Sequence, residues 1–177
     1  MNRPPTPQPP PRDLTGVVRL RRELLADGMT DTQIDCLVRS KRLHRVRYGA
    51  YVPYDVWESC SPEDQHRLLT RAVLARAHDE TVLTHVSSLV ERGVPTWGVP
   101  LDVVHTTRRG PERAGRRQQD WVPHRGLLGP ADVEVLNGVR VSTAARSAFE
   151  LTTIVGVEAG LVAVNRMLHA GLMTMDE

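Results

Sequence analysis

The chain has 177 residues, 40% hydrophobic and 25% charged, which is the mix of a globular protein with one ordinary domain or two very small ones. Its two cysteines exclude a disulfide scaffold and predict a reducing cytoplasm, and no apolar run approaches the roughly 18–20 residues of a membrane span. We therefore expect no membrane partner, and the proline-rich N-terminus does not have the pattern of a secretory signal.

The net charge of +2 is unevenly distributed along the chain. Residues 1–53 carry a net charge of +5 and residues 108–125 a net charge of +4, whereas the segments that follow each of them are acidic. Two separate basic segments favour a partner with phosphates. The alternative is that these charges only keep the surface soluble.

The N-terminal elements are marked by strong local signals. Residues 1–12 hold six of the thirteen prolines, which predicts a disordered or polyproline tail. Spaced leucines predict a helix over Arg19–Asp27, which Gly28 ends. Thr30 and Gln33 then form a capping box, which begins a second helix.

The second helix and the segment after it predict a helix–hairpin unit. The helix should end near Ser40–Arg42, and its apolar face consists of Ile34, Leu37 and Val38. Cys36 is expected to be a small buried residue on this helix. Leu43–Pro53 then has the spacing of a short β-hairpin that bends at Gly49.

The rest of the chain predicts a mixed domain of helices and a small sheet. Helices are expected to begin at Ser61 with Pro62, at Thr84 or His85, at Ser142 or Thr143, and at Val157. Strands are expected at Val82-Leu83, Leu101–Thr106, Trp121–His124, Val133–Leu136 and Val139–Val141, with a tight turn at Asn137-Gly138. The fold class is thus α+β, with a tail over 1–12, a winged helix-turn-helix over 13–55 and an α+β domain over 56–177.

Two short helices followed by a basic hairpin are the layout of a winged helix, whose second helix enters the major groove of DNA. No acidic residue lies between Arg39 and Arg47, so this stretch can neutralise phosphates. Arg45 and Arg47 are expected to share one face of the wing. The predicted DNA-binding residues are Thr30, Thr32, Gln33, Arg39, Lys41, Arg42, Arg45 and Arg47. The alternative is a solvated face on a small protein–protein module.

A second basic cluster lies in a segment with no periodicity, which predicts an exposed loop over Arg108–Gln119. Three roles stay open for this loop: it grips nucleic acid, it meets an acidic protein partner, or it is simply solvated. Its basic residues are Arg108, Arg109, Arg113, Arg116 and Arg117.

The sequence carries no recognisable catalytic motif. The only lysine, Lys41, has no acid two residues before it, so the restriction-nuclease motif is absent, as are the P-loop pattern and zinc-ligand spacings. We therefore expect a non-enzyme with no catalytic residues, no cofactor and no metal. His105 and His124 should meet on adjacent strands as a partly buried, hydrogen-bonded pair, a functional pair being the alternative, and His85 should be structural. Arg146 is expected to pair with Glu150.

The ordered set of segments resembles the AbiEi-type antitoxin family of type IV toxin–antitoxin systems, over about residues 14–173. The segments that carry the resemblance are 16–51, 83–89, 103–106, 122–125, 132–133, 138–143 and 146–151. The resemblance implies an N-terminal domain that binds operator DNA and represses its own operon, as part of phage defence by abortive infection. It also implies a C-terminal domain that counters a nucleotidyltransferase-like toxin, directly or functionally.

Two departures from the family pattern affect these expectations. A proline-rich tail replaces a helix that usually precedes the first segment, so we expect a smaller core and DNA binding that is weak or needs a homodimer. Relatives often continue into a Vsr-like endonuclease domain, whereas this chain stops at Glu177, as a stand-alone form or as a fragment. The alternatives to an antitoxin are thus the DNA-targeting regulatory half of such a nuclease, lacking its catalytic domain, and a protein-interaction module.

Overall fold

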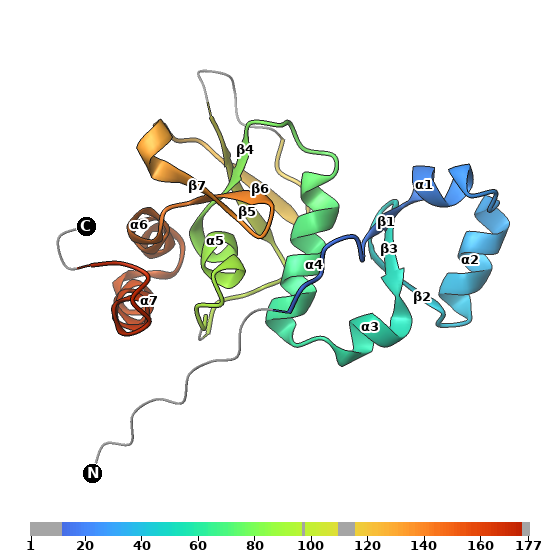
Figure 1. The fold of residues 1–177 in the computed structure, drawn as a ribbon, viewed down its shortest axis with the longest axis horizontal. Coiled ribbons are helices and arrows are strands. Elements are labelled where there is room, and N and C mark those ends of the chain that lie inside the picture. The colour runs from blue at the N-terminus through green and yellow to red at the C-terminus, as the bar shows by residue number, and fades with distance from the viewer. Residues whose placement is uncertain (1–11, 97, 110–115, 175–177) are drawn as a thin grey trace, which may run out of the picture.

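The computed structural model describes residues 12–96, 98–109 and 116–174. Residues 1–11 of the tail predicted over residues 1–12 lie outside this range, as does Arg113. The described residues form helices and two small sheets, so the predicted α+β class is confirmed (Figure 1). Within this part of the chain, no helix has the length and hydropathy that crossing a membrane would require.

The N-terminal unit consists of a three-stranded antiparallel sheet with two short helices on it. The sheet order is β1-β3-β2, which places the first strand beside the last one. The predicted hairpin and both predicted helices are present. The elements are β1 Arg19–Leu20, α1 Arg21–Ala26, α2 Asp31–Arg39, β2 Leu43–Arg47 and β3 Ala50–Pro53, followed by α3 Tyr54–Ser59 and α4 Pro62–Leu74.

Strand β3 packs against helices on both of its faces. On one face, the Tyr51 side chain forms a core cluster with Leu24 of α1 and Ile34 of α2. On the other face, Val52 packs in a cluster with Leu68 of α4, and Ala50 in a cluster with Ala72. Helix α4 therefore supplies core that we expected this unit to lack, because a proline-rich segment stands where the family pattern has a helix.

The second unit is built on a mixed five-stranded sheet with the order β6-β5-β4-β8-β7. Strand β4 is parallel to β8 and β5 is parallel to β6, whereas the other neighbours are antiparallel. The elements are β4 Thr81–Leu83, α5 His85–Glu91, β5 Val104–Arg108, β6 Trp121–His124, the 3₁₀ turn Pro130–Asp132, β7 Val133–Leu136, β8 Val139–Ser142, α6 Ala144–Val155 and α7 Val157–His169.

Helix α4 lies between the two sheets and belongs to the core of both (Figure 1). Toward the second sheet, Leu69 and Val73 form a cluster with buried residues of β4, β5 and β8. A separate core joins α5 to α6 and α7 through residues such as Leu89, Leu151 and Met167. The two units are thus packed together through one shared helix.

Several local expectations need correction. Helix α3 was not predicted, and the expected strand over Leu101–Thr106 begins only at Val104 and continues to Arg108. Cys36 is exposed and not buried, because it lies on the side of α2 away from Ile34, two residues and thus about 200° around the helix. Thr143 occupies the N-cap of α6 without a side-chain capping bond.

The buried histidine of α4 gives a pH-dependent prediction. The ring of His66 makes hydrogen bonds to the Leu101 carbonyl oxygen (Nδ1, 2.8 Å) and the Ser87 hydroxyl (Nε2, 3.0 Å). Burial lowers the pKa of His66 below its ordinary value, although the bond to Leu101 and the charge of Glu91 oppose this. The unfolded chain therefore takes up a proton near pH 6.5 that the folded protein resists, and acid lowers the free energy of unfolding.

Chemical denaturation between pH 7.5 and pH 5 of wild type and of the His66→Gln variant measures this effect. We expect the free energy of unfolding of wild type to fall more steeply than that of the variant as the pH drops, by up to about 1.4 kcal/mol per pH unit. Parallel curves for the two proteins would contradict a neutral, buried His66.

Candidate nucleic-acid interface

The start of α2 is fixed by the predicted capping box, which the structure confirms. The Thr30 hydroxyl accepts a hydrogen bond from the Gln33 backbone N–H (3.3 Å), and the Thr30 N–H donates to Gln33 Oε1 (2.8 Å). The side-chain oxygen of Gln33 is therefore committed to the helix, and only its amide nitrogen can meet an outside acceptor without opening the box. Thr32 is exposed in the same turn.

The acid at the start of α2 is neutralised from α1. Arg21 Nε donates to an Asp31 carboxylate oxygen at 2.7 Å, and a second contact joins the same two side chains. Asp31 is the first residue of α2, so an uncompensated charge there would repel a phosphate. The ion pair with Arg21 reduces that repulsion and ties α1 to α2.

Four cations gather at the other end of α2 and on β2, and all four are exposed. We call them the basic strip: Arg39, Lys41, Arg42 and Arg45. Lys41 has a left-handed backbone (φ 55°), which turns the chain from α2 into the hairpin, and its Nζ lies 5.6 Å from the ring centroid of Tyr54. A nine-residue helix is about 13 Å long, so the predicted DNA-binding residues form two groups, one at each end of α2.

Arg47 does not join the basic strip. Its side chain is only 10% exposed, its Nε lies 3.0 Å from Asp120 Oδ2, and it also donates to Gln118 Oε1 at 2.7 Å. The register of the β2–β3 pair shifts between Arg45 and Arg47, so the simple alternation of a strand is interrupted there. Arg45 is exposed and Arg47 is not, so the two side chains do not share an exposed face of the wing as predicted.

The tip of the hairpin carries an aromatic side chain that is not among the predicted DNA-binding residues. Tyr48 is 78% exposed, and the following Gly49 has φ +76°. The Gly49 carbonyl accepts a hydrogen bond from the Arg21 N–H at 2.9 Å, which anchors the tip to α1. The only signal in the sequence was a Tyr-Gly pair at the bend of a basic hairpin.

The second basic segment reaches the hairpin from the other unit. Arg109 pairs with Glu80 at 3.8 Å, Arg108 ends β5 in a half-buried position, and Arg116 and Arg117 are exposed. The contact between Arg47 and Gln118 brings the end of this segment against β2. The two basic segments, more than 60 residues apart in sequence, are therefore in contact in the fold.

Two other side-chain pairs were predicted from the sequence, and both are present. His105 Nδ1 and His124 Nε2 lie 2.8 Å apart on neighbouring strands, and Arg146 Nε lies 2.9 Å from a Glu150 oxygen. His85, which we expected to be purely structural, stacks its ring on that of His124 with 3.8 Å between ring centroids.

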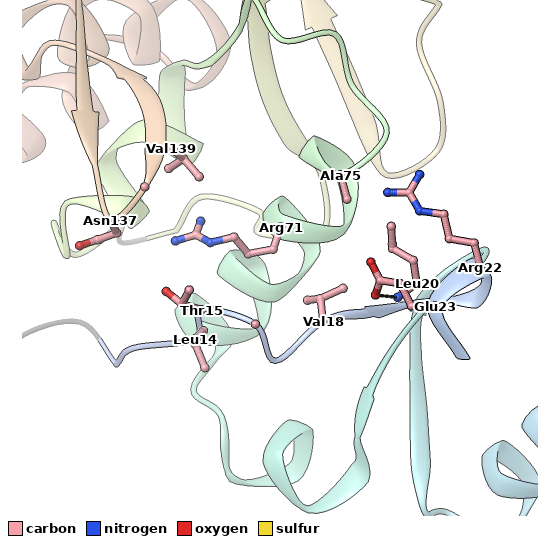
Figure 2. Close-up of a pocket in the computed structure, with 12 residues that line it drawn as sticks. Leu14, Thr15, Val18, Leu20, Arg22, Glu23, Arg71, Ala75, Asn137 and Val139 are labelled. Carbon is pink, nitrogen blue, oxygen red and sulfur yellow. Dashed lines mark hydrogen bonds between the residues drawn. The ribbon is translucent and has the colours of Figure 1, made fainter. Parts of the chain in front are cut away.

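A cavity of about 290 Å³ lies between the N-terminal segment, α4 and the β7–β8 turn (Figure 2). Its most prominent polar group is Arg71, whose guanidinium is already bound by both oxygens of Glu91. Glu23 on the opposite side accepts a hydrogen bond from the Leu20 N–H at 2.9 Å. Arg71 and Glu23 thus each have a partner within the protein, so we assign no ligand to this cavity.

Comparison with known proteins leaves the family unassigned. No protein-family model matches the chain, and no curated protein matches it. The interface is therefore interpreted from its own geometry, in which an exposed helix start, a basic strip and an aromatic hairpin tip occupy one unit.

Proposed function

We propose that this chain binds double-stranded DNA through α2 and the β2–β3 hairpin, as the antitoxin and autorepressor of a type IV toxin–antitoxin operon. The observation that carries the DNA-binding proposal is the basic strip, four exposed cations within seven residues and no acid among them. The antitoxin assignment rests on the resemblance of the sequence to the AbiEi-type family. It places the protein in the cytoplasm, where its operator and its toxin would be.

The proposed binding mode follows from the two ends of α2. The start of the helix, with Thr32 and Gln33, faces base edges in the major groove, which is wide enough for one helix. The basic strip neutralises phosphates on the flanking backbone. Tyr48 at the hairpin tip meets the sugar–phosphate surface next to the groove.

A salt series with the protein's own upstream DNA tests this mode. We expect fluorescence anisotropy to show tighter binding to that duplex than to a scrambled one. The Arg42→Gln/Arg45→Gln variant should weaken binding to both duplexes and make the slope of log K against log salt shallower by about 1.8, since each lost phosphate contact contributes about 0.9. Arg166→Gln, an exposed arginine on α7, is the matched control and should bind as wild type does.

The proposal would fail if the double variant kept the wild-type slope, because the basic strip would then contribute nothing to binding. Equal affinity for both duplexes, with a steep slope, would leave a non-specific DNA-binding protein and remove the autorepressor role.

The antitoxin part of the proposal needs a surface for a second protein, and α6 and α7 offer one. Phe149 of α6 is 68% exposed, and Val157 and Leu161 of α7 are 66% and 62% exposed. Large apolar side chains exposed on two packed helices favour a protein partner. The same observation supports the alternative of a protein-interaction module.

Co-expression with the product of the neighbouring gene separates these two functions. We expect wild type to relieve toxicity of that product, and Phe149→Ser/Leu161→Ser to do so less well while DNA affinity is unchanged. Neutralisation that is unaffected by the double substitution would exclude this surface.

A further inference from the structure

Three histidines from three different elements meet beside the second sheet. They are His85, the first residue of α5, His105 on β5 and His124 on β6, and each can place a ring nitrogen within 4.8 Å of the other two. His105 Nδ1 and His124 Nε2 are 2.8 Å apart. The ring centroid of His85 lies 3.8 Å from that of His124 and 5.6 Å from that of His105.

The sheet topology explains why residues nearly twenty positions apart converge. Strands β5 and β6 are parallel neighbours, with His105 opposite Val122 and His124 opposite Thr107, so the two histidines lie diagonally across the pair. His85 follows β4, the other neighbour of β5, and has φ +53°. A left-handed backbone is uncommon for a residue other than glycine, and such conformations gather at functional sites.

The surroundings of the three imidazoles favour their neutral form. Burial lowers the pKa of His85 to about 3 and that of His105 to about 4, with a further contribution from the neighbouring histidines. Burial also lowers the pKa of His124. A neutral imidazole carries a lone pair on one ring nitrogen, and this is the form that binds metals.

A supporting layer of polar groups holds His85. Its Nδ1 lies 3.0 Å from the Thr84 hydroxyl, which lies 3.2 Å from the Thr107 hydroxyl. Glu150 Oε2 is 4.0 Å from the same Nδ1, and this carboxylate is fixed by Arg146 and the Ser142 hydroxyl. Metal-binding histidines characteristically have such partners on the ring nitrogen that does not face the ion, and with Nδ1 held in this way Nε2 is the nitrogen that turns to the metal.

We propose that His85, His105 and His124 bind a divalent transition metal, with Zn²⁺ as the best fit. Zn–N bonds of about 2.0–2.1 Å in a tetrahedral site place the ligand nitrogens about 3.3–3.4 Å apart. The observed 2.8 Å between His105 and His124 opens to this spacing by about half an ångström, while the His85 ring turns away from the His124 ring. His105 and His124 are only half-buried, so an ion can reach the site and a fourth position stays open to water. This proposal replaces the expectation of no metal and does not depend on DNA binding.

Cobalt and zinc binding to the untagged full chain, freed of metal with a chelator, tests the proposal. We expect one Co²⁺ per chain, with the intense visible absorption of a four- or five-coordinate site, and its displacement by Zn²⁺. His105→Asn should weaken Zn²⁺ binding in calorimetry by about 100-fold or more. His169→Asn, which changes an exposed histidine on α7, is the matched control and should bind as wild type does.

A weak six-coordinate cobalt spectrum would overturn the proposal, because it would indicate adventitious surface binding, and so would equal Zn²⁺ affinity of wild type and His105→Asn. Should His105→Asn fail to fold by circular dichroism, His124→Asn takes its place. The thermal midpoint gives a second readout, because Zn²⁺ should raise it in wild type and not in the folded variant. An equal rise in both proteins would also overturn the site.

Discussion

Replacing Glu91 with alanine should lower the free energy of unfolding by about 3–5 kcal/mol. Glu91 ends α5 and is 1% exposed, with both carboxylate oxygens bound to Arg71 at 2.7 and 2.8 Å. Asn137 donates to the same carboxylate at 2.8 Å, and Arg67 lies 3.7 Å away. Burial by itself would raise the pKa of Glu91, but Arg71, Asn137 and Arg67 together more than offset it, so the pKa lies below its ordinary value.

The expected loss of stability is large because the arginines that contact Glu91 remain in the variant. In Glu91→Ala, the Arg71 side chain, only 16% exposed, keeps its charge without the carboxylate that compensates it, and Arg67, 4% exposed, is left with its ion pair to Asp64. Urea unfolding of wild type and variant measures the loss. Asp27→Ala is the control, since it breaks an exposed ion pair with Arg19 and should cost at most about 1 kcal/mol. Equal losses in the two variants would mean that the buried network is worth no more than a surface pair.

Replacing Leu68 with alanine should cost about 2–5 kcal/mol, the range for large-to-small changes in a tight core. Leu68 is fully buried on α4, in one cluster with Leu14 and with Val52 of the hairpin. The loss has two parts. One is the hydrophobic free energy of the methyl groups removed from the core, and the other is the cost of the cavity left beneath β3. Thermal and urea unfolding measure it, with Leu127→Ala, at an 83% exposed leucine, as the control.

This second prediction tests the role that the fold gives to α4. If Leu68→Ala unfolded as easily as the control, with a loss below about 0.5 kcal/mol, the hairpin would not depend on α4 for its core. The hairpin of the proposed DNA-binding unit would then be stabilised by packing against α1 and α2 alone.

The elements that could be predicted are those with a local signal. The Thr30–Gln33 box and the Ser61-Pro62 start mark helices at the positions where the structure has them. Asn137-Gly138 forms the tight turn between β7 and β8, with φ 49° and 76° at its two residues. Each of these signals acts over four residues or fewer, so a single sequence reveals it.

The features that could not be predicted are a very short helix and contacts between residues far apart in the sequence. Helix α3 has six residues and its N-cap, Pro53, makes no side-chain capping bond, so neither a long period nor a start signal marks it. Arg47 is held by Asp120, 73 residues later, and this ion pair decides that its side chain leaves the solvent. The histidine group was predicted only as far as the pair on adjacent strands, because the third member arrives through the βα turn at His85.

The sharing of α4 between two sheets has a consequence for the order in which the chain folds. Three of the core clusters draw their buried members only from residues 14–72, so the N-terminal unit can close as soon as that stretch has been synthesised. The second sheet takes longer to complete, because β4 pairs with β5 at Thr106 and then with β8 at Val141, 58 residues after Leu83. Long-range pairing of this kind is slow to form. We therefore expect the hairpin unit to appear first on the ribosome, with the exposed face of α4 as the template on which the second sheet assembles.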